Sequence, residues 1–364
     1  MKKRIALILS LVLALGLFAS AAGAETFIKP DMDMKVKKPA STANNPVIAG
    51  EDPYTGLPTD VDAFTPILQV FDGAEEAFPH WGIGSASVVL EIPNDSFSNC
   101  KLLGLFTSEF PELAGGTRSA RMCSLVFANV FNSIYISAGP GMAEDGNGNN
   151  IVETQRKKWS IYSEDVRGIK QRYWNMLGND SLKVRTSEVV NPHNLLVRVD
   201  KIHELASTAD YSFEARPFLF TDEALTRGDE AAEITLDFSN SAANCRFEYS
   251  EDDGGYLRWS KMGSPSNPPS INYDRATQEE LVFANVIVMR SVLKNNRAIS
   301  YDNNLVGGGQ ADIFQNGRHI QGTWYRADEY SRLIFMDENG NELEFQRGKT
   351  FIAVNNATLV VSYE

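Results

Sequence analysis

The chain has 364 residues, with 34 Lys and Arg against 47 Asp and Glu, and a formal net charge of −13 at pH 7. A charge of this sign repels phosphate backbones and anionic membrane surfaces, so nucleic acid is excluded as an expected partner. The length exceeds what one ordinary hydrophobic core organises and therefore predicts two domains.

Residues 1–24 have the pattern of a secretory signal peptide. A basic start precedes an apolar run at 5–18, and Ala22-Gly23-Ala24 suits a cleavage site. The run is shorter than a bilayer-spanning helix needs, and no second one follows. We expect an extracytoplasmic protein, secreted or associated with the cell surface, with no transmembrane span in the mature chain. The alternative is an uncleaved segment kept as an anchor. No lipobox cysteine stands at the expected cleavage point.

Residues 25–50 are rich in Lys, Pro, Ala, Ser and Asn with little periodicity, which is typical of a flexible tether. Residues 51–225 mix strand and helix signals and are expected to form an N-terminal α+β domain with an Arg-centred site. The expected strands are 87–92, 102–107 and 134–138, and the expected helices are 119–132, one or two within 153–177, and one that opens at Asn191.

Residues 226–364 change to a period of two, with short runs broken by turns such as Asn316-Gly317. This half is predicted to be a β-rich, mostly antiparallel C-terminal domain. The fold class is therefore α+β: a mixed α/β N-terminal domain followed by a mostly antiparallel β domain.

Two arginines at the expected start of a helix are the most unusual local feature. Thr117 or Ser119 would cap the helix and place Arg118 and Arg121 in its first turn. Cations there oppose the helix dipole unless an anion compensates for them. Because backbone N–H groups are also free at a helix start, the pattern favours a carboxylate or phosphate site.

The three cysteines leave two readings open. Cys100 and Cys123 flank one strand-loop-helix unit and are the more natural pair, but buried thiols explain the sequence equally well. The spacings of a zinc site are absent, and the run from Asp145 departs from a calcium loop at its sixth and twelfth positions. We therefore expect no metal and no cofactor.

Several motifs, in a fixed order, resemble one known family. They include Thr117-Arg118-Ser119-Ala120-Arg121, Pro192-His193-Asn194, Leu305-Val306-Gly307-Gly308-Gly309 and Gln321-Gly322-Thr323-Trp324. These runs are similar to the YerB-like family of envelope lipoproteins of Firmicutes, over roughly residues 52–354. The resemblance implies two domains and an extracytoplasmic address. It implies no activity, since the family has no known function. The missing lipobox cysteine departs from the family pattern, as does Gly115-Gly116-Thr117, where the family tends to show Gly-Pro-Val.

The candidate ligand-binding residues are Arg118, Ser119, Arg121, Glu91, His193 and Asn194. The arginines would hold an anion, or would instead pair with internal carboxylates, of which Glu91 is the leading candidate. His193 would act as an acid or base beside Glu91, or would only fix its loop.

The function expected from these residues is an exported, non-catalytic module that recognises an anionic cell-wall ligand or an envelope partner protein. The alternative is an enzyme that processes envelope glycan or peptide, with Glu91 and His193 as catalytic residues and Arg118 and Arg121 as an anion clamp. A purely structural scaffold is a third possibility.

Overall fold

The computed structural model describes residues 25–364, apart from residues 98, 164–170, 208–211, 241 and 296–297. The expected signal peptide at 1–24 lies outside the described residues. Within the described ranges, no helix is both long enough and apolar enough to cross a membrane.

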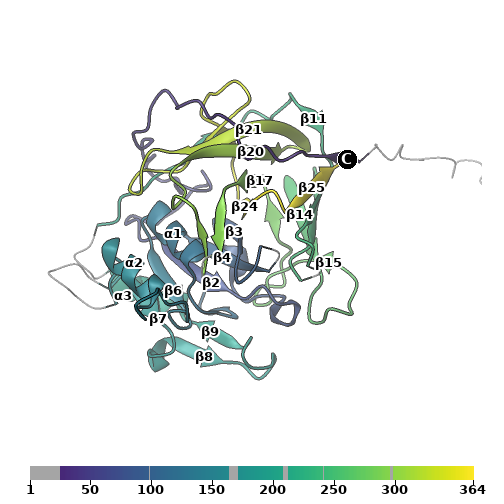
Figure 1. Cartoon of the computed structure of the whole chain (residues 1–364). Helices are drawn as coiled ribbons and strands as arrows, with labels where there is room; N and C mark the ends of the chain where they lie inside the picture. The colour runs from purple at the N-terminus through teal and green to yellow at the C-terminus, as the bar shows by residue number, and fades with distance from the viewer. Residues whose placement is uncertain (1–24, 98, 164–170, 208–211, 241, 296–297) are drawn as a thin grey trace, which may run out of the picture.

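A large mixed sheet forms the centre of the molecule (Figure 1). Its ten-strand path runs β11 (Asp229–Glu230), β21 (Arg318–Arg326), β20 (Gly307–Gln315), β17 (Asn285–Arg290), β24 (Thr350–Asn355), β3 (Val88–Pro93), β4 (Cys100–Phe106), β2 (Ile67–Phe71), β6 (Ile134–Ser137) and β7 (Tyr173–Asn175). An eleventh strand, β22 (Ile334–Met336), pairs with β21. Strands β3, β4 and β2 are buried along their whole length, which explains their continuous apolar runs.

This sheet takes strands from both sides of the expected boundary between residues 225 and 226. Strand β24 pairs in parallel with β3, with Thr350 opposite Val88, and pairs in parallel with β17 on its other side. The two halves of the chain are therefore joined by continuous backbone hydrogen bonding.

A second, seven-stranded sheet is built mainly from the C-terminal half. It runs β1 (Thr26–Phe27), β25 (Val360–Tyr363), β12 (Glu233–Asp237), β13 (Cys245–Ser250), β14 (Gly255–Ser260) and β15 (Ser270–Ile271), with β16 (Val282–Phe283) also paired to β14. Its pairings are antiparallel, as the alternating pattern predicts.

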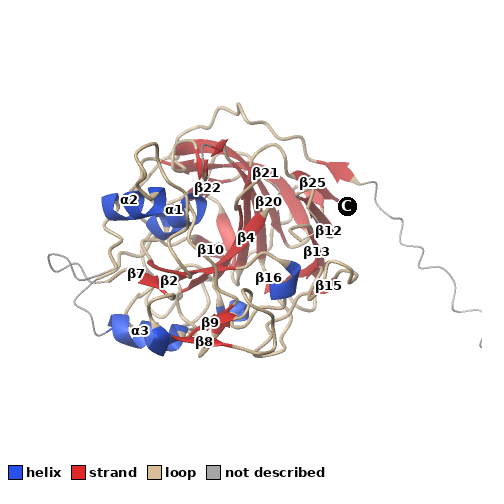
Figure 2. Cartoon of the chain, turned by 60° about the horizontal axis from the view of Figure 1, so that its bottom comes forward, coloured by secondary structure: helices blue, strands red, loops and turns tan. Residues whose placement is uncertain are grey.

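Two hydrophobic cores lie on opposite faces of the central sheet. One contains Leu68, Val70, Leu90 and Leu103 together with α1 (Met122–Val130) and part of α2 (Ile151–Lys158). The other contains Ile67, Phe71, Val89 and Leu102 together with side chains of the second sheet. The result is a three-layer arrangement with helices, sheet and sheet, and Figure 2 shows α1 and α2 together on one side.

Three small sheets complete the fold. They pair β5 (Ala114–Gly115), β9 (Leu195–Val197) and β8 (Lys183–Arg185); β10 (Leu219–Thr221) and β23 (Glu344–Gln346); and β18 (Leu293–Asn295) and β19 (Ile299–Tyr301). Short 3-10 helices span Glu75–Ala77, Ile83–Ser85 and Asp180–Leu182.

The helix that was expected to begin at Asn191 begins later in the chain. Leu195–Val197 is strand β9, and helix α3 (Val199–Ser207) begins only after it. A short apolar run is compatible with either a strand or a buried helix. Leu195–Val197 forms a strand because it pairs with β5 and β8. The 119–132 helix is present as the shorter α1, and the 153–177 region holds α2 and strand β7, with 164–170 outside the described residues.

The structure contains more β-strand than the predicted α+β fold class implies. Strands make up about 36% of the residues and helices about 11%, so the structure is largely β-sheet and the mixed α/β character of the first half is not confirmed. The helices α1, α2 and α3 are short and lie at the left of Figure 1.

Residues 25–50, predicted to be a flexible tether, lie against the folded part of the chain instead. Thr26–Phe27 adds a strand to β25, the Asp31 amide donates to the Gln310 side chain, and Arg332 donates to the Ala43 carbonyl. In Figure 1 this purple segment passes over β20 and β21. Composition alone misses these contacts because they are made through backbone groups.

Candidate functional site

The segment that carries the two arginines is held in an extended form between the ends of two parallel strands. Its Arg118 amide donates to the Val70 carbonyl of β2, and its Ala120 amide donates to the Gly139 carbonyl just beyond β6. Strands β2 and β6 are parallel neighbours. The carboxyl ends of parallel strands are where open sheets commonly place binding sites.

The predicted position of the arginines on the helix is wrong. Arg121 occupies the N-cap position of α1, and Arg118 lies three residues before it in extended backbone, so the two do not share the first helical turn. The Ser124 hydroxyl, within the helix, accepts the Arg121 amide. Neither Thr117 nor Ser119 caps the helix; the Ser119 hydroxyl donates to the Ala138 carbonyl and ties the segment to the end of β6.

Arg118 and His193 share one carboxylate, that of Asp72. The His193 Nδ1 atom lies 2.6 Å from Asp72 Oδ2, and Arg118 Nε lies 3.3 Å from the same oxygen. Asp72 is buried and directly follows β2. His193 is therefore brought to Arg118 as predicted, but its acidic partner is Asp72 and not Glu91.

Arg121 pairs with a different carboxylate, that of Asp95. Its Nε lies 2.9 Å from Asp95 Oδ1, and the Asn94 side chain donates to the other oxygen of Asp95. Burial acts to raise the pKa of Asp95, but the hydrogen bond and charge of Arg121 outweigh it, so the pKa of this carboxyl is lowered.

Lys101 is the residue that gives this cluster an unsatisfied charge. It is only 3% exposed, yet among the described residues no hydrogen bond or ion pair is made by its ammonium. Burial, followed by the charge of Arg121, lowers the pKa of Lys101 to about 8, and the other charges that act on it are Asp72, Arg118 and Asp95. Lys101 therefore lies among the two arginines and their carboxylates, and we name these five residues the cationic cluster.

Glu91 does not belong to this site. Its carboxylate lies 3.1 Å from Arg258 Nη2, and both side chains are buried on the face of the central sheet that meets the second sheet. Lys101 lies in the neighbouring strand, β4. Its register with β3 places it on the other face of the sheet, which packs against the opposite hydrophobic core. The expectation that Glu91 partners Arg118, Arg121 or His193 is thus wrong, because side chains alternate between sheet faces and Glu91 falls on the other one.

Asn194 has a structural role in the loop before β9. Its side chain donates to the Thr186 carbonyl and accepts from Arg185. It stays next to His193 in the chain, but these bonds direct its amide group to the β8 side of the loop.

A pocket of about 280 Å³ opens beside the cationic cluster. Its polar lining comes from Asn94, Asp95, Arg121 and Asn295, and its apolar lining comes from Met142, Ala143, Ala298 and Ile299. The site therefore offers both a charged end and an apolar wall.

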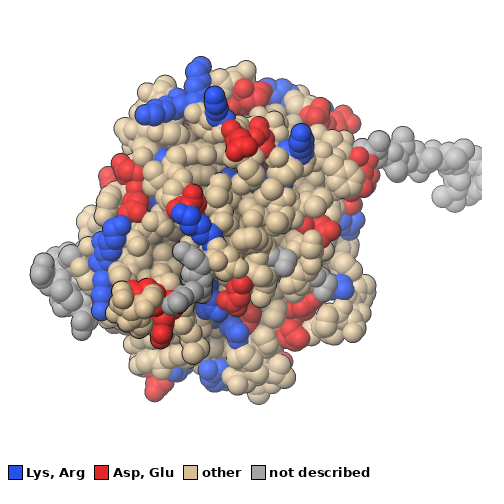
Figure 3. All heavy atoms as spheres, viewed as in Figure 1, with Lys and Arg blue, Asp and Glu red and all other residues tan. Residues whose placement is uncertain are grey.

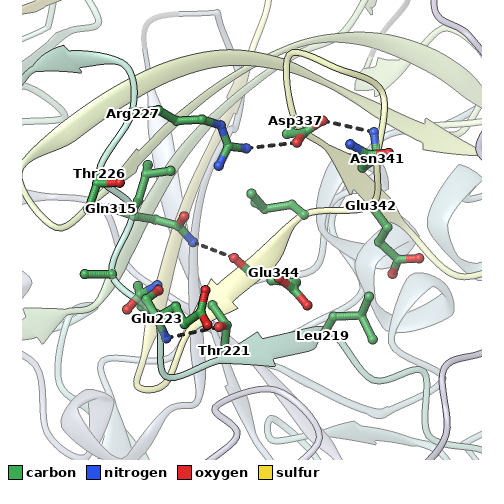
Figure 4. A pocket seen from close by; sticks show the side chains of 14 residues that line it. Leu219, Thr221, Glu223, Thr226, Arg227, Gln315, Asp337, Asn341, Glu342 and Glu344 are labelled. Atoms are coloured by element: carbon green, nitrogen blue, oxygen red, sulfur yellow. Dashed lines mark hydrogen bonds and ion pairs between the residues drawn. The ribbon is translucent and has the colours of Figure 1, made fainter.

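A larger pocket, about 500 Å³, lies elsewhere and is shown in Figure 4. Its charged groups are largely matched within the protein: Arg227 pairs with Asp337 and Glu338, and the Asp337 carboxylate accepts the amides of Asn339 and Asn341. These bonds hold the Asp337 run in a turn. Because Arg227 is already paired with carboxylates, it is not free to hold an anionic ligand in this pocket.

On the face shown in Figure 3 and among the described residues, neither surface charge nor acidic clusters indicate another anion or metal site. On the face in Figure 3, basic and acidic side chains are interspersed. Over the described part of the chain, no three His, Cys, Asp or Glu side chains form a group that could hold a metal ion. The three cysteines are free and buried, so of the two readings the buried thiols are confirmed and the Cys100–Cys123 pair is not formed.

Sequence reasoning missed Lys101, Asp72 and Asp95. Lys101 interrupts an otherwise apolar buried strand, and Asp72 directly follows the apolar run of β2. A lone lysine in a fully buried strand is rare without a partner, and this was the available signal. Asp95 lies in a polar loop and carries no comparable signal.

Comparison with known proteins places this architecture in a described class. Residues 54–212 match the N-terminal domain of "Protein of unknown function (DUF3048)", and residues 234–352 match the C-terminal domain of the same family. The chain therefore belongs to this two-domain family of unknown function.

A particular relative is known from Bacillus subtilis (strain 168) and is named "Putative lipoprotein YerB". It is 26% identical over 313 residues, which span 83% of this chain and 85% of the relative. The crystal structure of YerB protein from Bacillus subtilis superposes with a TM-score of 0.66 at 23% identity, covering 85% of this chain and 99% of that chain. This structural similarity shows that the chain has the same fold as the Bacillus protein.

Proposed function

We propose that the protein is an extracytoplasmic binding module that holds an anionic group at Lys101, Arg118 and Arg121. The observation that carries this proposal is Lys101, whose side chain is only 3% exposed and whose ammonium makes no hydrogen bond or ion pair among the described residues. A buried charge without a partner is strongly unfavourable, and a protein retains one where a ligand of opposite charge supplies the partner.

The charges of the cluster support an anion as the ligand. Three cations face two carboxylates, Asp72 and Asp95, so one positive charge remains before any contribution of His193. The start of α1 adds a partial positive charge next to Arg121.

The proposed address outside the cytoplasm rests on two supports. Residues 1–24 have the signal-peptide pattern, and the Bacillus relative is named a lipoprotein. An envelope location would bring the site near carboxylated and phosphorylated cell-wall components, which are anions of the required kind.

A second candidate function is hydrolysis, and it is favoured by the 2.6 Å contact between His193 and Asp72. A carboxylate that orients a histidine is a common acid–base pair, and Arg118 would stabilise a developing negative charge. No serine, threonine or cysteine is placed against His193 by the contacts of the described residues, so this reading requires water as the nucleophile.

The test of anion binding uses inorganic phosphate as the probe. Isothermal titration in a phosphate-free buffer should show binding to the wild type, a loss of at least about tenfold in affinity in Lys101→Met and Arg118→Ala, and no change in Lys201→Met. Lys201 is a suitable control because it is exposed and paired with Glu204 on α3. Equal affinity in the wild type and a folded Lys101→Met variant would refute the proposed site.

A further inference from the structure

The pocket of about 500 Å³ in Figure 4 has the size of a small-molecule site. None of its lining residues belongs to the cationic cluster or lines the pocket beside that cluster. One wall is the short parallel sheet of β10 and β23, where Leu219 is opposite Glu344 and Thr221 is opposite Gln346. These four lining residues are two apart in each strand and therefore share one face of the sheet.

Negative charge in this lining exceeds what the protein itself neutralises. Four carboxylates line the pocket, and those of Asp337 and Glu342 are paired with arginines. The carboxylates of Glu223 and Glu344 make no hydrogen bond or ion pair among the described residues. Arg227, the one cation among the described lining residues, is already paired. Two negative charges are therefore left unmatched in the pocket.

A buried amide also turns one unpaired atom toward the pocket. Gln315 is only 1% exposed, and its Nε2 donates to Asn285 Oδ1 at 2.7 Å and to the Glu344 carbonyl at 3.4 Å. Its Oε1 accepts no hydrogen bond from the described residues, and Figure 4 shows the side chain directed into the pocket. Because the Nε2 bonds fix the amide, its oxygen is held as an acceptor for a donor from outside the chain.

We propose that this pocket binds an aliphatic diamine. Ammonium groups carry positive charge for Glu223 and Glu344, and their N–H bonds can donate to Gln315 Oε1. A divalent metal ion is the competing cation, but the described residues contain no group of three side chains that could hold one. Three leucines of the lining offer hydrocarbon surface to the chain that joins the two amines: Leu219, Leu225 and Leu343. This site is independent of the proposed anion site.

Three probes of equal length separate charge from shape: linear diaminopentane with terminal amines, the matching aminopentane, and the matching pentanediol. Isothermal titration at low ionic strength should show binding of the diamine, because salt screens accessible charges. Each accessible ion pair changes affinity by up to about fivefold. The monoamine should therefore bind about fivefold more weakly than the diamine, and pentanediol more than about tenfold more weakly.

Variants of the two unmatched carboxylates test the location. Glu223→Gln and Glu344→Gln should each weaken diamine binding by about fivefold and leave the binding of inorganic phosphate unchanged. Both residues are exposed, so the substitutions are compatible with folding. Glu279→Gln is the matched control, because Glu279 is also exposed but does not line the pocket, and it should change neither affinity.

Four results would overturn this proposal. They are no binding of the diamine to the folded protein, equal affinity for the diamine and pentanediol, no effect of either glutamate variant, and displacement of the diamine by equimolar Mg²⁺. Failure of the anion site would appear differently, as phosphate binding that is absent or insensitive to Lys101→Met. Each proposal can therefore fail while the other stands.

Discussion

Replacement of Lys101 by methionine should make the free protein more stable. Methionine keeps the length and most of the volume of the lysine side chain but removes its charge, and Lys101 is buried without a partner. Most substitutions in a buried strand destabilise, so the expected sign is opposite to the usual one.

The magnitude follows from the pKa of the ammonium. Burial, helped by Arg121, lowers this pKa from 10.5 to about 8, which corresponds to about 3 kcal/mol of stability lost when the group is charged. Because the folded pKa lies below the unfolded one, the folded protein holds this proton more weakly. The loss is complete below about pH 8 and disappears as the pH rises through 8 to 10.5.

The assay is urea unfolding of wild type and Lys101→Met from pH 7 to pH 10.5 in a buffer without phosphate or sulfate. The difference in unfolding free energy between the two proteins is the useful quantity, because the titration of other groups cancels in it. The variant should be more stable by about 3 kcal/mol at pH 7, and the difference should approach zero near pH 10.5. A difference that stays constant with pH, or a less stable variant at pH 7, would show that the ammonium has a partner in the folded protein.

The remaining predictions concern the interior. Arg258→Ala should lower the free energy of urea unfolding by about 3–5 kcal/mol, because it leaves the buried Glu91 carboxylate unpaired. Arg246→Ala, which breaks a more exposed ion pair, should lower it by less than about 1 kcal/mol. Similar losses in the two variants would contradict this account. Gly116→Ala should lower the melting temperature, since the added Cβ would lie 2.0 Å from a backbone oxygen, and Gly146→Ala, with open space around it, should not. The three buried thiols, each with a pKa raised by burial, should stay unreactive toward a disulfide reagent at pH 8 until the protein is unfolded; fast labelling of the native protein would disprove this.

The sequence predicts individual strands better than it predicts how they combine. Strands 87–92, 102–107 and 134–138 are present as β3, β4 and β6, because β-branched and leucine-rich runs have a strong local preference. The parallel pairing of β3 with β24 joins residues about 260 positions apart, and no local pattern encodes such a partner. For the same reason, the sharing of one sheet by the two halves could not be predicted.

The fold brings only some of the proposed site residues together, for a related reason. The arginines drew attention because their charge conflicts with a helix start, and His193 does lie beside Arg118 through Asp72. Glu91 was assigned to the site from its position at the end of a strand, but which face it occupies depends on the register with neighbouring strands. Lys101 was overlooked because it stands among apolar residues that indicated only a core strand.

The continuous sheet has a consequence for how the two family domains can be handled. Expression of residues 51–225 alone would leave β3 with an open, apolar edge where β24 normally pairs, and expression of residues 226–364 alone would leave β24 in the same state. Unpaired edges of this kind recruit other chains and aggregate. The two sequence domains are therefore one folding unit, and truncation at the boundary between them would remove the scaffold of both.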